Sequence, residues 1–225
     1  MFNHLDITTC LRYNEIINTQ TEKNMAISAV QTYLSPEEYI TLERKAIPTY
    51  DTVRSEYVNG AIITMSGASF SHNLITNNFS SELHTRLKGT GCAVFTNDMR
   101  ISIPTTNSYF YPDVGVICDE PRFEDDVFDT LLNPIIIVEV LSPSTEAYDR
   151  GEKLSHYQQL ESLKEYILVS QDRVYVERYL RKQDEWGYTS FREIDDVLPI
   201  ASIKCDLPLQ EIYERVTFPK EKKDE

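Results

Sequence analysis

The stretch PIIIVEVL, residues 134–141, is a run of β-branched residues with a single carboxylate inside it. A nearly continuous apolar run of this length is typical of a strand buried on both faces, as at the centre of a mixed sheet. The SPST sequence at 142–145 breaks the strand, a helix is predicted from about 148 to 162, and EYILV at 165–169 predicts a second strand. This strand–helix–strand unit indicates a right-handed crossover between two strands of one sheet.

Helices and strands are predicted on both sides of this unit. Ser35-Pro36 favours a helix start, because serine is a good N-cap and proline fits the first turn. Asn59-Gly60 predicts a hairpin over 55–65, and apolar residues at every fourth position predict a helix over 72–87. Further strands are predicted over 92–103 (interrupted at Asn97-Asp98), 109–118 and 173–180. The order of elements predicts an α/β (α+β) fold with a mixed central sheet flanked by helices.

Length and composition indicate a single globular domain. The 225 residues are 41% apolar and 26% charged, and we expect one domain over residues 26–218. Residues 1–24 lack periodicity and predict a poorly ordered extension, while 219–225 predict a charged tail. No apolar run approaches the roughly 20 residues of a membrane span, and no secretory signal pattern is present. The expected localisation is therefore cytoplasmic, with no membrane partner.

The cysteines are widely spaced and form no C-x-x-C pair, which argues against a zinc site and against a disulfide framework. We expect them to be reduced and mostly buried as small apolar side chains. The four positions are Cys10, Cys92, Cys118 and Cys205.

The formal net charge of −14 weighs against a nucleic-acid partner, since phosphate contacts usually require a basic surface. Part of the excess lies in the acidic stretch 119–129, where only Arg122 opposes the acids and where a solvated loop is predicted. A metal site also needs clustered acids, and its ion reverses the local sign of charge. The objection is weakened by these two points and still stands.

Glu139 is the carboxylate inside the central strand. Burying it requires a cation, hydrogen-bond donors or protonation. The alternation of side chains places it on the same face as Ile137, close to the strand end where α/β sheets bind ligands. An alternative of equal weight is a structural pair between Glu139 and an arginine or lysine.

Asp113 opens another apolar strand, and its spacing from Glu139 suits neighbouring antiparallel strands joined by a long connection. Two carboxylates that meet across strands repel unless a cation lies between them, and hard oxygen ligands select Mg²⁺ or Mn²⁺. The alternative for Asp113 is an ordinary turn residue after Tyr111-Pro112.

Lys153 lies beside the apolar stripe of the predicted helix 148–162. From there its side chain can reach back towards the strand end that carries Glu139, where an ammonium group would orient a water or stabilise charge on a phosphate. The alternative is an exposed lysine that pairs with Asp149 one helical turn earlier.

Three segments carry a family resemblance: YPDVGVIC at 111–118, IIIVEVLSPSTEAYDRGEKLSHYQQL at 135–160 and EYILVS at 165–170. They resemble the Uma family (Uma-two) of bacterial restriction endonucleases, in the PD-(D/E)XK nuclease superfamily, over about residues 26–180. The resemblance implies a restriction-endonuclease-like fold and a metal-dependent site that acts on DNA.

The resemblance implies a site built from Asp113, Glu139 and Lys153, with Asp113 and Glu139 as metal ligands. It adds Glu56, in the predicted hairpin, as a further acid, and His72, which opens the next helix, as a contact to phosphate or water. The alternative for His72 is a helix cap or a buried hydrogen bond. The superfamily lysine normally stands two residues after the second acid, where this chain has Leu141, so the resemblance implies that Lys153 replaces it.

These patterns predict Mg²⁺- or Mn²⁺-dependent hydrolysis of DNA phosphodiester bonds. Two alternatives remain open: a nuclease fold that has lost activity and serves as a binding or assembly module, and a phosphodiesterase that acts on RNA or nucleotides. Cutting both strands of a duplex is most simply done by a two-fold dimer, so a homodimer is the assembly that a duplex substrate would imply.

Overall fold

The structure is a computed structural model that describes residues 33–45, 54–65 and 67–219. The chain divides into two compact units, Met1–Ser66 and Gly67–Glu225. The predicted extension over 1–24 lies outside the described residues, and of the predicted tail only Pro219 is described. Among the residues described, no helix combines the length and the apolar character needed to cross a membrane.

The N-terminal unit begins with helix α2 (Pro36–Lys45), whose start is closed by a reciprocal cap. The backbone N–H of Glu38 donates to Ser35 Oγ at 3.2 Å, and the backbone N–H of Ser35 donates to Glu38 Oε2 at 2.8 Å. Two backbone N–H groups at the helix start, which have no acceptor within the helix, are satisfied in this way. The predicted helix start is confirmed.

A hairpin follows, with β1 (Ser55–Val58) and β2 (Ala61–Thr64) as its antiparallel strands. Its turn residues Asn59 and Gly60 have φ angles of 43° and 99°, the left-handed region in which asparagine and glycine are tolerated. The Asn59-Gly60 prediction is confirmed. The hydroxyl of Tyr39 in α2 donates to the backbone oxygen of Ser55 at 2.6 Å and ties the helix to the hairpin.

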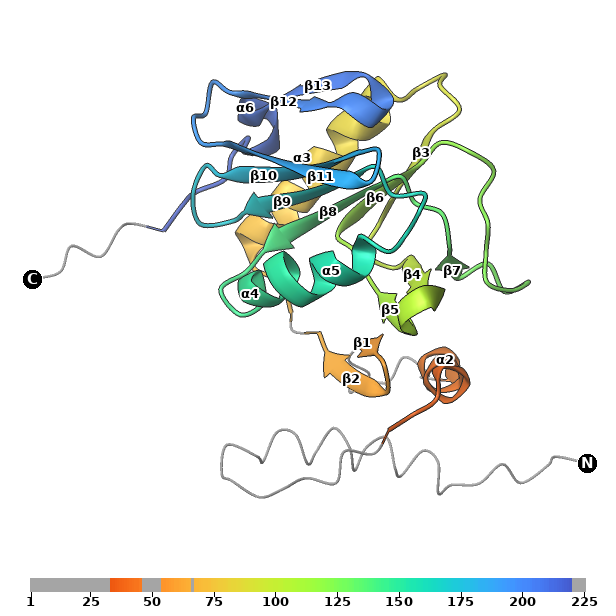
Figure 1. The fold of residues 1–225 in the computed structure, drawn as a ribbon. Helices are drawn as coiled ribbons and strands as arrows, with labels where there is room; N and C mark the ends of the chain where they lie inside the picture. Colours follow the sequence, from red (N-terminus) through yellow and green to blue (C-terminus); the bar gives the residue numbers. More distant parts are fainter. Residues whose placement is uncertain (1–32, 46–53, 66, 220–225) are drawn as a thin grey trace, which may run out of the picture. The chain divides into compact units, whose positions relative to one another are not determined.

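The C-terminal unit is built on a six-stranded mixed sheet in the order β11-β10-β9-β8-β6-β3 (Figure 1). β8 and β9 are parallel, and the remaining neighbours are antiparallel. This confirms the predicted mixed sheet and its strand–helix–strand unit. Every residue of β8 is buried. The strands are β3 (Ala93–Thr96), β6 (Val114–Ile117), β8 (Ile136–Leu141), β9 (Glu165–Ser170), β10 (Val176–Lys182) and β11 (Glu185–Phe191).

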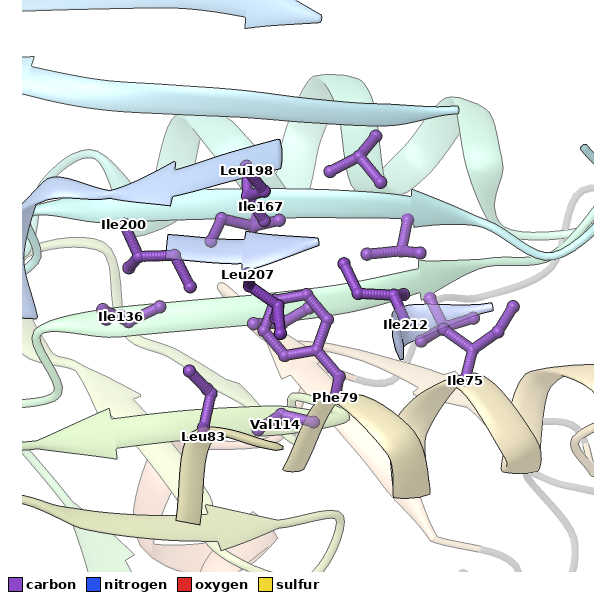
Figure 2. Close-up of a cluster of buried hydrophobic side chains, with 14 of the residues drawn as sticks. Ile75, Phe79, Leu83, Val114, Ile136, Ile167, Leu198, Ile200, Leu207 and Ile212 are labelled. Atoms are coloured by element: carbon purple, nitrogen blue, oxygen red, sulfur yellow. The ribbon is translucent and has the colours of Figure 1, made fainter. Parts of the chain in front are cut away.

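Helix α3 (Phe70–Arg86) covers one face of this sheet. Its residues Ile75, Phe79 and Leu83 are fully buried and share one apolar cluster with Val114 and Val138 of the sheet (Figure 2). The four-residue spacing that predicted the helix is the spacing of its buried face. The helix begins after Ser69, whose Oγ accepts the backbone N–H of His72 at 3.0 Å.

Beyond residue 180 the sequence patterns predict no element, whereas the structure continues with strands and a short helix after β10. Fully buried side chains from this region, among them Leu198, Leu207 and Ile212, join the same apolar cluster (Figure 2). The additional elements after β11 are β12 (Val197–Ile200), η3 (Ala201–Ile203), β13 (Cys205–Pro208) and α6 (Leu209–Ile212).

The strand predicted over 109–118 is two strands, β5 (Ser108–Phe110) and β6. β5 pairs with β4 (Arg100–Ile103), and β4 pairs in parallel with β7 (Thr130–Leu131). β5 therefore does not belong to the six-stranded sheet that contains β6. The break falls at Pro112, which has no backbone N–H and cannot continue a ladder. The predicted interruption at Asn97-Asp98 is confirmed, because β3 and β4 lie on its two sides.

The helix predicted from 148 to 162 is shorter and less regular than expected. It consists of α4 (Glu146–Tyr148), a π-helical turn at Asp149–Lys153 and α5 (Leu154–Tyr157). After it, the Arg181 guanidinium donates at 2.8 Å to the carbonyl oxygens of Gln158, Leu160 and Leu163. These contacts hold the stretch between α5 and β9 in place. The prediction of a helix to residue 162 is wrong, since α5 ends at Tyr157.

The prediction for the cysteines is also wrong, because Cys92 and Cys118 form a disulfide. The β3–β6 register pairs Ala93 with Ile117, so the next pair outward is Cys92 with Cys118. Their sequence separation of 26 residues concealed this proximity. Cys205 is free. All three of these cysteines are only partly buried, whereas the prediction expected most of them to be buried. Cys10 lies outside the described residues.

The acidic stretch 119–129 is exposed except at Phe123 and Asp129, as expected for a solvated loop.

Candidate active site

Asp113 and Glu139 are cross-strand neighbours at one end of the β6–β8 pairing. The last pair in register is Val114 with Val138, so the next step sets Asp113 opposite Glu139. Residues directly opposite each other in an antiparallel pair project from the same face. Asp113 Oδ2 also accepts the backbone N–H of Val140 at 2.7 Å, which fixes its carboxylate against β8.

Lys153 reaches this pair from the π-helical turn. Its Nζ lies 2.9 Å from Glu139 Oε1, and both side chains are only 5% exposed. The same Nζ lies 3.8 Å from Asp149 Oδ1 and 5.7 Å from the centre of the Phe110 ring. The alternative of an exposed Lys153 is therefore wrong. The contact with Glu139 agrees both with a site lysine and with a structural ion pair, so its role stays a prediction.

His72, in the first turn of α3, is the residue that this helix contributes to the site. Its Nε2 lies 3.3 Å from Asp113 Oδ2. Burial lowers the pKa of His72, but the hydrogen bond and the charge of Asp113, a bond to the Val140 backbone and the charge of Asp149 together raise it above its ordinary value. The cap of α3 is Ser69, so the alternative in which His72 caps the helix is wrong.

The charges of the cluster favour a cation. Three carboxylates gather here: those of Glu139 and Asp149 lie near the Lys153 ammonium, and that of Asp113 lies near His72. Asp113 is partly buried, and Glu139 and Asp149 are each 4% exposed. Little water screens charges in such a place, so carboxylates clustered here would interact strongly with a divalent ion.

The two carboxylates of Asp113 and Glu139 suit an Mg²⁺ or Mn²⁺ ion that has few protein ligands. Over residues 33–45, 54–65 and 67–219, no group of three or more His, Cys, Asp or Glu side chains is arranged to hold a metal ion. Mg²⁺ is commonly bound through one or two carboxylates and completes its octahedron with water and substrate phosphate oxygens. Asp113 and Glu139 offer that number of carboxylates.

Glu56 lies in β1 of the N-terminal unit, where it is paired in register with Ile63. Its part in the site stays a prediction.

Asp149 is the member of the cluster that the sequence analysis named only as a possible partner of Lys153 and not as a site residue. It is 4% exposed, and its backbone oxygen accepts the hydroxyl of Tyr166 at 3.1 Å. The signal for it is its position four residues before Lys153. Its neighbour Arg150 donates from Nε to Glu177 Oε2 at 2.6 Å.

The family model Uma2, described as "Putative restriction endonuclease", matches residues 36–209. Two uncharacterised proteins of Synechocystis sp., sll1609 and slr1290, are 37% and 36% identical to the chain over 166 and 186 residues. These alignments cover 73% and 82% of this chain and 91% and 94% of the two relatives. The match to the family model runs across both compact units.

The fold is also similar to the crystal structure of a putative nuclease of the DUF820 group from Anabaena variabilis. The TM-score is 0.65 at 21% identity, over 80% of this chain and 97% of that chain. The mixed sheet and this likeness define a restriction-endonuclease-like α/β protein. The chain belongs to the Uma2 family, which confirms the resemblance of segments 111–118, 135–160 and 165–170 and supports a nuclease-like function.

Proposed function

We propose that this protein is a metal-dependent nuclease that hydrolyses phosphodiester bonds of DNA, with Asp113 and Glu139 holding Mg²⁺ or Mn²⁺. The observation that carries the proposal is the register that sets these acids opposite each other, together with the 2.9 Å contact from Lys153 Nζ to Glu139. Acids on two strands and a lysine from a separate helical turn converge on one point of the sheet.

Each residue has a distinct part in this proposal. A bound Mg²⁺ ion would lower the pKa of a coordinated water and neutralise charge on the phosphate. Asp113 is held in place by the Val140 N–H and by His72. Lys153 places a positive charge beside Glu139, where it would orient the attacking water or share the charge that develops on the phosphate oxygens.

DNA is the proposed substrate because the family is described as restriction endonucleases. The net charge of −14 is the main argument for the alternative, a binding or assembly module without activity. Within the proposal, the ion is what allows an acidic cluster to accept a phosphate.

The test is cleavage of supercoiled and linear duplex DNA by the purified full chain in Mg²⁺ or Mn²⁺. We expect nicked or linear products that disappear with EDTA. The near-isosteric changes Asp113→Asn and Glu139→Gln should abolish cleavage, whereas the control Asp119→Asn, which removes an exposed acid of the loop, should leave it unchanged. Cleavage at the wild-type rate by both site variants would overturn the site.

Calorimetry separates the main proposal from its alternatives. A nuclease requires that Mn²⁺ bind to the wild-type protein and that binding be lost in Asp113→Asn. Absence of both Mn²⁺ binding and cleavage would favour the inactive module. Cleavage of RNA or nucleotides with DNA left intact would replace DNA as the substrate.

A further inference from the structure

Two tyrosines and two arginines gather in β11 and just outside the ends of β10 and β11, and we call them the tyrosine–arginine surface: Arg173, Tyr175, Tyr188 and Arg192. The guanidinium carbons of Arg173 and Arg192 each lie 5.0 Å from the centre of the Tyr175 ring. Tyr188 is 51% exposed, and its hydroxyl lies 3.0 Å from that of Tyr175. Arg173, Arg192 and Tyr188 are all exposed, although the chain has a net charge of −14.

This surface lies on the same face of the sheet as Glu139. The registers set Glu139 beside Leu168, Leu168 beside Glu177, and Glu177 beside Ser190, in one row across β8, β9, β10 and β11. Tyr188 is two residues from Ser190 along β11, so its side chain projects from this face. Adjacent strands are about 4.8 Å apart, so β11 lies about 14 Å from β8.

The acid beneath the tyrosines, Glu177, is paired with Arg150, which also contacts Glu146. Glu177 Oε1 accepts the hydroxyl of Tyr188 at 3.0 Å, and its Oε2 accepts Arg150 Nε at 2.6 Å. Arg150 belongs to the π-helical turn that also carries Lys153, so a chain of bonded side chains joins the exposed ring to the turn of the candidate site. Glu177 therefore holds the Tyr188 ring in place while its own charge is paired with Arg150.

We propose that the tyrosine–arginine surface binds unpaired nucleotides of the strand that enters the candidate site. A base stacks on the Tyr188 ring, and Arg173 and Arg192 contact the phosphates on either side of it. Aromatic side chains next to guanidinium groups are the usual means of holding single-stranded nucleic acid, because every base offers a π face and every nucleotide a charge. This inference rests on the proposed function, since it assumes that the substrate strand crosses this face of the sheet.

The test measures binding of a fluorescein-labelled thymidine oligonucleotide to the full chain by polarisation, in EDTA so that nothing is cut. We expect Tyr188→Ala to raise the Kd about tenfold, as for loss of one stacked base. Tyr188→Phe keeps the ring and should stay within about twofold of wild type. Each of Arg173→Ala and Arg192→Ala should reduce the slope of log affinity against log salt by about 0.7.

Two matched controls remove comparable groups elsewhere. Phe128 is an aromatic residue with 62% exposure in the acidic stretch 119–129, and Phe128→Ala should leave the Kd unchanged. Arg215 is exposed beside Glu214, and Arg215→Ala makes the same change in net charge as either arginine variant. The proposal would be overturned if Phe128→Ala and Arg215→Ala both raised the Kd as much as the variants of the tyrosine–arginine surface do.

Other outcomes are equally decisive. The proposal fails if Tyr188→Ala binds as wild type, or if Tyr188→Phe loses as much affinity as Tyr188→Ala, because the ring would then not matter. It also fails if gel filtration shows that Tyr188→Ala converts an oligomer to a monomer without changing the Kd, which would make the surface an interface between copies. Circular dichroism melts of each variant show that the fold is retained.

Cleavage in Mg²⁺ is measured separately. A wild-type protein that cuts DNA but shows none of these changes in Kd refutes only the tyrosine–arginine surface. A protein that shows the expected changes in Kd but never cuts refutes only the proposed hydrolysis.

Discussion

Asp113 Oδ2 accepts the backbone N–H of Val140, the residue that follows Glu139, at 2.7 Å. One carboxylate is thus anchored to the strand that carries the other. This bond explains how two like charges remain neighbours where pairing between β6 and β8 ends. It also makes the position of Asp113 depend on β8 as well as on its own strand.

Removing the Lys153 ammonium should destabilise the fold as well as stop cleavage. Lys153→Met deprives the buried Glu139 of its cation, and breaking a buried pair of this kind costs about 3 kcal/mol. Urea denaturation measures the change. The double variant Lys153→Met/Glu139→Gln should recover part of the lost stability while remaining inactive, because Glu139 no longer carries a buried charge, although Asp149 still loses its contact with Lys153. An additive loss in the double variant would contradict a coupled pair.

The disulfide between Cys92 and Cys118 should stabilise the C-terminal unit. Closing a loop with a sequence separation of 26 residues contributes about 3 kcal/mol in the chain-entropy description. Reductant should therefore lower the urea midpoint of the wild-type protein. The Cys92→Ser/Cys118→Ser variant should unfold at that lower midpoint with or without reductant, while Cys205→Ser should behave as wild type. A midpoint that does not respond to reductant would exclude a stabilising disulfide.

Arg181 should be more important for stability than its half-buried position suggests. Its guanidinium donates to the carbonyls of Gln158, Leu160 and Leu163 and lies 4.5 Å from the centre of the Trp186 ring. Lysine keeps the charge but lacks the planar fork, so Arg181→Lys should lower the free energy of unfolding by about 2 kcal/mol. Arg215→Lys, at an exposed position, should change it by less than about 0.5 kcal/mol. Equal effects would refute the structural assignment of Arg181.

Glu165 should make the fold more stable in mild acid than at neutral pH. Burial raises the pKa of Glu165, although the Ser202 N–H, which donates to its Oε1 at 2.7 Å, lowers it in part. With a higher pKa in the folded state, the folded protein binds the extra proton, so stability falls as pH rises from about 4.5 through the folded value. Denaturant midpoints of the wild-type protein and Glu165→Gln across this range measure the difference. A difference that does not vary with pH would contradict the shift.

The sheet and its main helices could be predicted because their patterns are local. The apolar run 134–141 is buried along all of β8, and the four-residue spacing over 72–87 is the buried face of α3. Asn59-Gly60 favours a tight hairpin turn through its own backbone preferences, independently of the rest of the fold. The candidate site could also be inferred, since Glu139 is an acid in a strand that otherwise has no reason to hold one.

Contacts between distant parts of the chain could not be predicted. Cys92 meets Cys118 only because β3 and β6 are in register, and Arg181 of β10 meets the carbonyls that follow α5 only in the folded chain. Apolar periodicity and turn chemistry depend on neighbours within a few residues, so the amino-acid sequence alone determined β8, α3, the hairpin turn and the candidate acids. Which side chains meet depends on register and packing across the sheet, and these were decided only when the whole chain was folded.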